Sequence, residues 1–290
     1  MGQAEWDSFS FDGIGTRWEV STPRPLAASV RARLLALVER YDGVWSRFRD
    51  DSTVAAISRQ SGRYVMPDEA EHLGGLYRSL YDITAGAMTP LIGGSLERLG
   101  YDPSYSLRPT GPALPAPHWE DVLMWDGAVL TTTVPFVLDI GAAGKGQLVD
   151  LLAAELRFQG EADFLVDASG DLLHSGRDPV TVALEHPYDS TKAIGTLPLA
   201  GGALCASASN RRAWGDGLHH MLDGTTGLPV STAVATWTMA DSTMVADALA
   251  TALFFVPGAA LEQSFDFSWL TVFSDGSAAY SAGFEGTLFT

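Results

Sequence analysis

The most informative segment of the sequence is Val134-Pro-Phe-Val-Leu-Asp-Ile-Gly141-Ala-Ala-Gly144-Lys145-Gly146-Gln147-Leu-Val-Asp150. Its first part, residues 134–140, is apolar and predicts a strand. Leucines at 148, 152 and 156 follow the glycines at i+4 spacing and predict a helix that begins directly after them. Glycines let a ligand approach the backbone, and a helix start offers unpaired N–H groups and the positive end of its dipole. The segment predicts a phosphate site; the alternative is a tight strand-to-helix turn without a ligand.

The spacing Gly-x-x-Gly-Lys-Gly separates this segment from the common nucleotide motifs. It matches neither the Rossmann pattern G-x-G-x-x-G nor the Walker pattern G-x-x-x-x-G-K-[ST]. One cysteine, Cys205, and the lack of an H-E-x-x-H sequence exclude the usual zinc spacings. No G-x-S-x-G elbow is present, which argues against a serine hydrolase.

Outward from this segment, the chain alternates strand-like runs with few, well-separated helices. We expect a pair of strands over residues 9–20, a helix from Pro25 to about Asp42, and a long loop over about residues 102–118, where five prolines fall. Further strand-like runs cover residues 122–124, 164–167, 180–184, 235–239 and 269–274. This pattern predicts the α+β class, and we expect one domain over residues 1–290 made of two closely packed lobes.

The charge of the chain excludes one class of partner. Its 290 residues carry 35 Asp and Glu against 18 Lys and Arg, a formal net charge of −17. Nucleic acid binds through basic residues that release condensed counterions, so we expect no nucleic acid partner. A single cysteine forms no intrachain disulfide. The N-terminal residues show no signal peptide, so we expect a cytoplasmic protein, or an exported one whose signal has been removed.

A second informative segment is the longest apolar stretch, Met244 to Leu261, where we expect a helix from Thr243 to Val256. It contains Asp247, and a carboxylate at the centre of a membrane helix costs about 2.5–3.5 kcal/mol, so a buried helix is expected rather than a membrane span. Asp247 and Thr251 lie at i and i+4 and therefore share one helix face. A carboxylate and a hydroxyl together suit a hard cation such as Mg²⁺. The alternative is that Thr251 bonds back to the helix and Asp247 caps it or pairs with an arginine.

The third segment is Trp214-Gly-Asp-Gly-Leu-His219-His220-Met-Leu-Asp223-Gly-Thr-Thr226-Gly227-Leu-Pro229. A histidine shortly before the turn predicted at Asp223-Gly-x-Thr-Gly could act as a general base, since the pKa of histidine lies near neutrality. The alternative is a structural histidine.

In order along the chain, these segments resemble the ApbE family of FAD:protein FMN transferases. The resemblance covers about residues 11–256 and rests on six blocks. They are Ile14-Gly15-Thr16, Ser46 to Ser52, Leu138 to Asp150, Asp167 to Leu172, His220 to Pro229, and Ala246 to Phe254.

The resemblance implies a bilobed α+β fold with antiparallel or mixed sheets, flanking helices and FAD bound between the lobes. It implies FAD as substrate, Mg²⁺ as cofactor, and an acceptor protein whose Thr or Ser hydroxyl attacks the FMN-side phosphorus while AMP leaves. It implies His220 as the base that deprotonates this hydroxyl, with Asp247 as the competing assignment. The implied metal ligands are the Gly144 carbonyl, Asp247 and Thr251. The implied ligand contacts are Ile14, Phe48, Ala87, Met88, Thr89, Gly141, Lys145, Gln147 and His220.

Four residues at three places depart from the family pattern. Met88 and Thr89 replace Phe-Asp, Gly224 replaces a proline, and Ile14 replaces a methionine. These departures leave two further hypotheses open: a FAD pyrophosphatase that yields FMN and AMP, and a non-catalytic flavin or nucleotide binder. In each case a chain of charge −17 needs a local positive region for an anionic ligand. The candidate sources are the glycine-loop N–H groups, the helix N-terminus, a divalent cation and Lys145.

Overall fold

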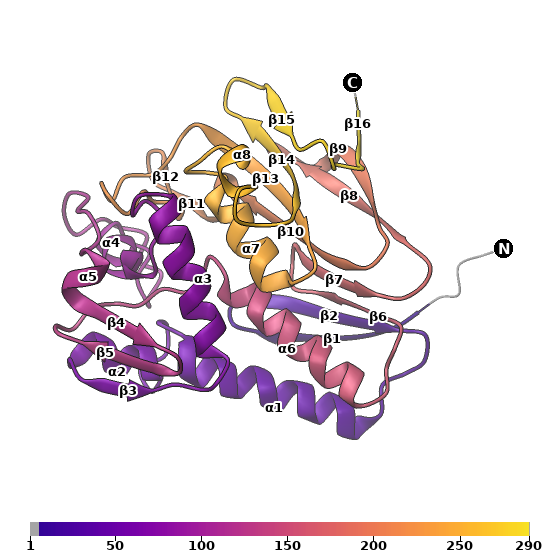
Figure 1. The fold of residues 1–290 in the computed structure, drawn as a ribbon, viewed down its shortest axis with the longest axis horizontal. Coiled ribbons are helices and arrows are strands. Elements are labelled where there is room, and N and C mark those ends of the chain that lie inside the picture. The colour runs from indigo at the N-terminus through magenta and orange to yellow at the C-terminus, as the bar shows by residue number, and fades with distance from the viewer. Residues whose placement is uncertain (1–5, 290) are drawn as a thin grey trace.

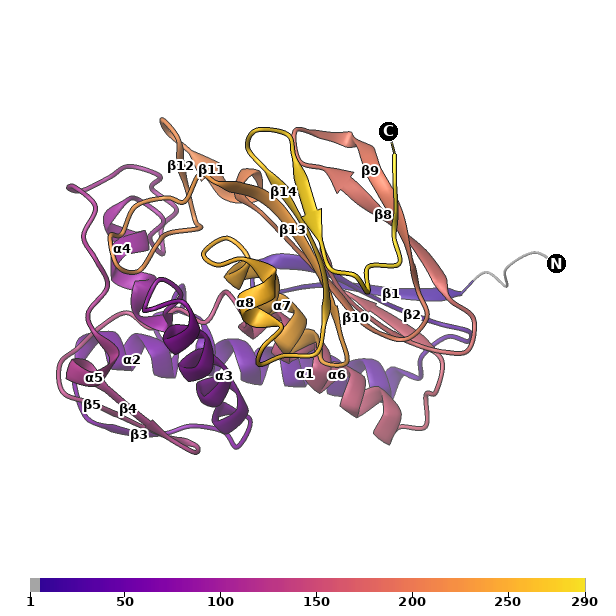
Figure 2. The same cartoon turned by 45° about the horizontal axis from the view of Figure 1, so that its top comes forward.

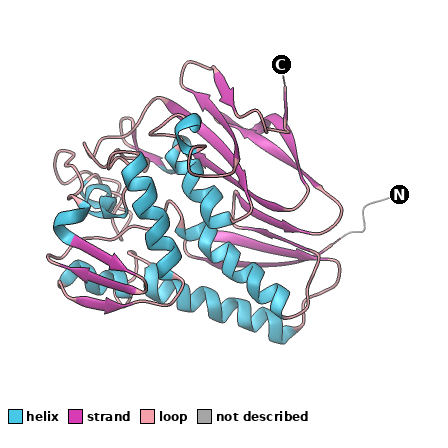
Figure 3. Cartoon of the chain, viewed as in Figure 1, coloured by secondary structure: helices cyan, strands magenta, loops and turns pink. Residues whose placement is uncertain are grey.

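The computed structural model describes residues 6–289, and an eight-stranded antiparallel sheet organises that part of the chain. Figure 1 shows the sheet with helices packed in front of it, and Figure 3 shows most helices gathered on one side of the molecule. The strands, in order across the sheet, are β1 (Asp7–Gly13), β2 (Thr16–Thr22), β6 (Phe164–Asp167), β7 (Asp171–Ser175), β10 (Gly202–Ala208), β13 (Ala233–Ala240), β14 (Ser268–Phe273) and β15 (Ala278–Tyr280).

Smaller sheets flank this one. One contains β16 (Thr287–Leu288), β9 (Asp189–Leu199) and β8 (Val180–His186), and another contains β3 (Arg63–Val65), β5 (Val129–Thr132) and β4 (Leu123–Asp126). A two-stranded ladder joins β11 (Ala213–Trp214) to β12 (Leu218–His219). The described helices are α1 (Ala28–Trp45), α2 (Thr53–Arg59), α3 (Ala70–Ile83), α4 (Gly93–Arg98), α5 (Trp119–Val122), α6 (Gly144–Phe158), α7 (Thr243–Ala252), α8 (Gly258–Leu261) and the 3₁₀ turns η1 (Pro90–Ile92) and η2 (Ser209–Arg212).

The main sheet is buried on both faces, as the alternation of side chains along β10 requires. Ala203 and Cys205 pack on the α7 side, together with Ala246 and Ala250. Leu204, between them in sequence, belongs to the cluster formed with the β8–β9 hairpin. Figure 2 shows that hairpin on the side of the sheet away from α7. Small side chains on one face let α7 lie close to the sheet.

Two threonines of β13 fix α7 at this close distance. The hydroxyl of Thr236 donates to the carbonyl of Ala250, and that of Thr238 donates to the carbonyl of Ala246, each at 2.6 Å. Helix α6 then packs against α7, and α1 packs against α6. The glycine-loop helix and the helix that carries Asp247 are therefore neighbours.

The sequence predicted fewer than half of these elements, including α1, α6 and α7. The α+β class is confirmed, the paired strands over residues 9–20 are β1 and β2, and residues 102–118 form a loop. Helix α1 begins at Ala28 and ends at Trp45, both three residues later than expected. Helix α7 ends at Ala252, four residues before the predicted end. Within residues 6–289, no helix combines the length and apolar character needed to span a membrane.

The predicted strand over residues 134–140 is wrong. This segment is extended but belongs to no described sheet. Phe136, Leu138 and Ile140 are buried on alternate positions, and Asp139 donates its N–H to the carbonyl of Pro90 at 2.8 Å. The alternating pattern therefore arises because one side of an extended segment is buried against η1 and the core. It does not indicate pairing with another strand.

Candidate functional site

Two adjoining cavities lie where α6, α7 and the loops around them meet. The first, which we call the carboxylate cavity, has a volume of about 320 Å³ and is lined by Asp247, Thr251 and His220 among others. The second, the aromatic cavity, has a volume of about 500 Å³ and is lined by Phe48, Tyr101 and other aromatic residues. The two share lining residues, so they form one continuous site. The shared residues are Gly15, Tyr101, Asp139, Gly141, Lys145 and Arg212.

The structure brings eleven of the twelve residues predicted for the site to these cavities. Some line the carboxylate cavity, some the aromatic cavity, and Gly141 and Lys145 line both. The first group contains Ala87, Met88, Thr89, His220, Asp247 and Thr251. The second contains Ile14, Phe48 and Gly144.

Gln147 is the exception, because it lines neither cavity. It is buried in α6; its side-chain N–H group donates to the carbonyl of Glu69 at 2.8 Å, and its side-chain carbonyl accepts from the hydroxyl of Tyr41 at 3.0 Å. Its amide is used inside the protein, so the structure supports a positioning role for Gln147 in place of the predicted flavin contact.

Asp247 and Thr251 occupy one face of α7, as their i, i+4 spacing predicts. Asp247 is 4% exposed, and its Oδ2 accepts the N–H of Gly146 at 2.9 Å. It therefore caps α6 rather than its own helix, and it forms no ion pair with an arginine among the described residues. Gly146 permits this contact, because a Cβ there would lie 2.3 Å from the carbonyl oxygen of Thr243.

The third predicted metal ligand, Gly144, is placed differently. Its carbonyl accepts the hydroxyl of Tyr41 at 2.8 Å, and it lines the aromatic rather than the carboxylate cavity. Within residues 6–289, no group of three or more His, Cys, Asp and Glu side chains could hold a metal ion. Of the three predicted metal ligands, Asp247 and Thr251 line the carboxylate cavity and offer it oxygen donors.

A second buried carboxylate lies close to Asp247. Asp171 is fully buried on β7, and its Oδ2 forms an ion pair with Nζ of Lys145 at 2.5 Å. Its Oδ1 is buried without a hydrogen-bond partner. Burial raises the pKa of Asp247 well above its ordinary value, the negative charge of Asp171 raises it further, and Lys145 opposes both. Two carboxylates face one ammonium group, so this end of the cavity has room for more positive charge.

Three N–H groups of the glycine loop already donate to acceptors inside the protein. The N–H of Gly141 donates to Asp139 at 2.7 Å, that of Gly144 to Ile140 at 2.7 Å, and that of Gly146 to Asp247. The charge of Lys145 is matched by Asp171. The sequence suggested that N–H groups of this loop donate to a phosphate. These three N–H groups already have acceptors inside the protein, and the loop shapes the site by close packing.

Asp150 holds α6 and α7 in register. Its carboxylate accepts the Ser242 hydroxyl at 2.8 Å and the N–H groups of Thr243 and Met244 at 2.9 and 3.0 Å. These are the first N–H groups of α7, which favour a negative charge. One side chain of α6 therefore caps the helix that carries Asp247.

We predict that Asp150→Ala destabilises the protein by about 2–4 kcal/mol, because three charge-assisted hydrogen bonds and a helix cap are lost. Asp150→Asn keeps one acceptor oxygen and should cost less. Urea unfolding of both variants, followed by circular dichroism, measures the difference. Equal stability of Asp150→Ala and the parent protein would contradict the capping role.

The aromatic cavity is walled by rings that already stack on one another. Phe48 lies parallel to Tyr105, with ring centroids 5.1 Å apart and an interplanar angle of 11°, and Tyr101 stacks on Trp214 at 5.6 Å. Tyr105 is about half exposed. Stacked and edge-on rings at these distances suit a flat aromatic ligand.

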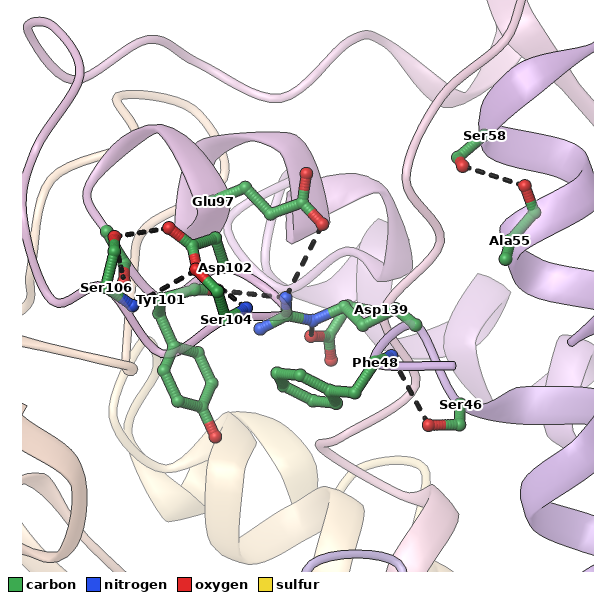
Figure 4. A network of polar contacts seen from close by, with 12 residues as sticks. Ser46, Phe48, Ala55, Ser58, Glu97, Tyr101, Asp102, Ser104, Ser106 and Asp139 are labelled. Carbon is green, nitrogen blue, oxygen red and sulfur yellow. Dashed lines mark hydrogen bonds and ion pairs between the residues drawn. The ribbon is translucent and has the colours of Figure 1, made fainter. Parts of the chain in front are cut away.

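A buried arginine supports this wall from behind. Arg47 donates to Asp139 at 2.6 Å and to the carbonyl of Tyr101 at 2.9 Å, and its guanidinium lies 4.2 Å from the centre of the Phe48 ring. Glu97 is 3.7 Å from the same guanidinium. Figure 4 shows Glu97, Tyr101, Phe48 and Asp139 around this network. Since Asp139 also accepts the Gly141 N–H, the network ties the aromatic wall to the glycine loop.

His220 lies in the wall of the carboxylate cavity. Burial lowers its pKa to about 3, and the positive charge of Arg212 contributes. Its Nδ1 is buried without a hydrogen-bond partner. With a pKa of about 3 the imidazole is neutral at neutral pH, and this pKa lies well below the near-neutral value on which the sequence argument for a general base rested.

The three departures from the family pattern all lie at the cavities or on their rim. Thr89 caps η1 through a hydrogen bond from the Leu91 N–H at 3.2 Å. A Cβ at Gly224 would lie 2.6 Å from both the carbonyl oxygen of Gly86 and Cγ2 of Thr89, so this position has no room for a larger residue. Ile14 has φ 41°, an unusual conformation for a β-branched residue, at the turn between β1 and β2.

Several residues of the site were missed from the sequence. Asp171 lies within the block from Asp167 to Leu172, but nothing in that spacing shows its pairing with Lys145. Tyr101 and Tyr105 lie at the start of the proline-rich loop, and Trp214 and Arg212 precede the His220 block. The signal available in the sequence was the group of aromatic residues next to a proline-rich loop. That these residues meet at one cavity could be seen only in the fold.

Known proteins resemble this chain over most of its length. The sequence pattern described as the ApbE family matches residues 14–266. The FAD:protein FMN transferase of Vibrio cholerae is 28% identical over 227 residues, which cover 74% of this chain and 66% of that protein. The one from Rhodobacter capsulatus is 27% identical over 266 residues, which cover 85% of this chain and 50% of that protein. The chain therefore spans between half and two thirds of these relatives.

Solved structures confirm the fold. The ApbE protein of Thermotoga maritima superposes with a TM-score of 0.81 at 23% identity, over 96% of this chain and 97% of that one. The flavin transferase ApbE of Vibrio cholerae gives a TM-score of 0.79 at 20% identity, over 98% and 99% of the two chains.

Proposed function

Because this chain belongs to the ApbE family, we propose that it is a transferase that moves FMN from FAD to the Thr or Ser hydroxyl of an acceptor protein, with release of AMP and dependence on Mg²⁺. One observation carries the proposal: a buried carboxylate and hydroxyl, Asp247 and Thr251, lie in a cavity continuous with an aromatic one. A metal-binding end and a ring-binding end in one site suit a dinucleotide that contains a flavin ring.

The residues of the carboxylate cavity fit a divalent cation. Asp247 and Asp171 are buried beside a single ammonium group, and one oxygen of Asp171 has no hydrogen-bond partner. Mg²⁺ prefers oxygen donors and usually keeps water or phosphate oxygens as further ligands, so Asp247 and Thr251 are sufficient side-chain donors. When bound, the cation would offset negative charge on the phosphoryl oxygens. We propose the Gly144 carbonyl as a third donor, since its oxygen accepts one hydrogen bond from Tyr41 and keeps a second lone pair for the cation.

The chain's own residues then divide the remaining tasks. Phe48 and the rings around it hold an aromatic ring of FAD, and Gly141 keeps the junction of the cavities open. His220 accepts the proton of the acceptor hydroxyl as the oxygen attacks the FMN-side phosphorus and the bond to AMP breaks. Asp247 is the weaker candidate for this base, because a metal ligand must be deprotonated and engaged before the reaction.

The experiment that tests the function uses the intact chain, FAD, Mg²⁺ and an acceptor protein with the motif D-x-x-[ST]-[GA]-A-[TS]. We expect mass spectrometry to show one FMN added to the acceptor and chromatography to show an equal amount of AMP. AMP without labelled acceptor would indicate a FAD pyrophosphatase instead. Saturable FAD binding without AMP would indicate a non-catalytic binder, and either result would overturn the proposal.

A further inference from the structure

Five cationic side chains line the two cavities, and any of them that is unpaired would act together with a bound divalent cation in attracting a dianionic diphosphate to a chain of charge −17. They differ in whether a carboxylate already matches their charge. The five are Arg47, Arg49, Lys145, Arg211 and Arg212.

Four of the five are matched by carboxylates. Arg47 pairs with Asp139 at 2.6 Å, and Lys145 pairs with Asp171 at 2.5 Å. Arg49 contacts three carboxylates, of which Glu39 is the nearest at 2.7 Å. Arg211 pairs with Glu185 at 2.7 Å. A matched cation contributes little net attraction for a further anion, so none of these four is a free positive charge.

Arg212 differs from the other four. Among the described residues, no carboxylate lies within ion-pair distance of its guanidinium. It is one of the six residues shared by both cavities, so it lies at their junction. Its guanidinium is 5.9 Å from the centre of the Tyr101 ring, and its charge contributes to the lowered pKa of His220. It thus lies near both the aromatic wall and the proposed base.

We propose that Arg212 is a catalytic residue that binds the phosphate groups of the dinucleotide at the junction of the two cavities. This inference rests on the proposed function and names the protein side chain that supplies its positive region. The glycine-loop N–H groups at 141, 144 and 146 and the charge of Lys145 are used internally, so Arg212 is the cation left for the ligand. A planar guanidinium can donate two parallel hydrogen bonds to one phosphate.

The geometry also links Arg212 to the chemical step. A cation between the aromatic wall and His220 lies beside the phosphorus that the acceptor oxygen attacks. Its charge stabilises the negative charge that grows on the phosphoryl oxygens as the bond to AMP breaks. The attacking hydroxyl loses its proton to His220, and AMP leaves with the electron pair of the broken bond.

The test compares Arg212→Gln with Arg177→Gln, which makes the same charge change at an exposed arginine that lines neither cavity. Calorimetry measures the binding of FAD, of ADP and of riboflavin, which has the ring but no phosphate. We expect Arg212→Gln to weaken FAD and ADP binding by about 10- to 100-fold, as for a lost charge-assisted hydrogen bond, and to leave riboflavin binding unchanged. Arg212→Lys should restore part of the affinity, because lysine keeps the positive charge but cannot donate two parallel hydrogen bonds to one phosphate.

The outcomes separate this inference from the proposed function. Equal loss of riboflavin and FAD binding in Arg212→Gln would show damage to the ring site and overturn the phosphate role. An equal effect of Arg177→Gln would also overturn it, because the overall charge of the protein would then explain the loss of binding. If the parent protein binds ADP through Arg212 but transfers no FMN, the inference stands and the proposed function fails.

Discussion

Asp247→Ala is expected to lower FMN transfer by at least about 100-fold, because it removes the one charged donor of the proposed metal site. Asp247→Asn should be almost as inactive, since an amide keeps the shape but not the charge. The assay is AMP release at saturating FAD and Mg²⁺. Asp241→Asn, an exposed change just before α7, is the matched control and should retain full activity.

Asp247→Asn should not be less stable than the parent protein. Burial and Asp171 raise the pKa of Asp247 in the folded state, so ionising it at neutral pH opposes folding. This penalty is absent below the unfolded pKa of about 4 and grows as the pH rises toward the folded pKa. Asp247→Asn removes the penalty and can still accept the Gly146 N–H. We therefore expect an equal or higher melting temperature at pH 7.

Two results would contradict this account of Asp247. Retained transfer activity in Asp247→Ala would show that the carboxylate is dispensable. A large loss of stability in Asp247→Asn would show that its role is structural, and the loss of activity would then carry no information about metal binding.

His220→Asn is expected to lower kcat for FMN transfer by about 10²–10⁴, the range for loss of a general base. FAD binding should change little, because the imidazole acts on the acceptor hydroxyl. Calorimetry with FAD and single-turnover transfer measured on the same variant separate the two effects. A loss confined to FAD affinity, with kcat unchanged, would remove His220 from the proton transfer.

The pH dependence gives an independent check on His220. Its pKa is lowered to about 3, so the ring is unprotonated at pH 5 and above in the free protein. At saturating Mg²⁺, kcat/KM should therefore show no fall near pH 6.5 through His220. A fall with an apparent pKa near 6.5 that disappears in His220→Asn would show that the imidazole is solvated rather than buried.

The sequence predicted the parts of the fold that depend on local pattern. The β1–β2 pair, α1, α6 and α7 follow from hydrophobic spacing along one segment, and the i, i+4 spacing of Asp247 and Thr251 places both on one helix face. The strand predicted over residues 134–140 was wrong, because an extended segment with one buried side has the same alternating pattern whether or not another strand pairs with it. Local pattern does not specify which segments pair.

The residues expected at the site lie close together, while their roles toward FAD and a metal stay predictions. Eleven of the twelve predicted residues line the cavities, but the charge on Lys145 is matched by Asp171 from a different strand. The N–H of Gly146 is likewise taken by Asp247, 101 residues along the chain. Such contacts arise from packing between distant segments, so no motif shows them. The free charge on Arg212 became visible only when the other cations were found to be paired.

The central claim is that this chain transfers FMN from FAD to an acceptor hydroxyl with a divalent cation at Asp247 and Thr251. The most direct test follows covalent flavin on the acceptor protein by mass spectrometry, with Mg²⁺ present and after its removal by a chelator. The account predicts one FMN per acceptor with Mg²⁺, none after chelation, and recovery when Mg²⁺ is added back. Transfer that continues unchanged in the chelator, or no transfer with Mg²⁺ to an acceptor carrying the motif, would contradict it.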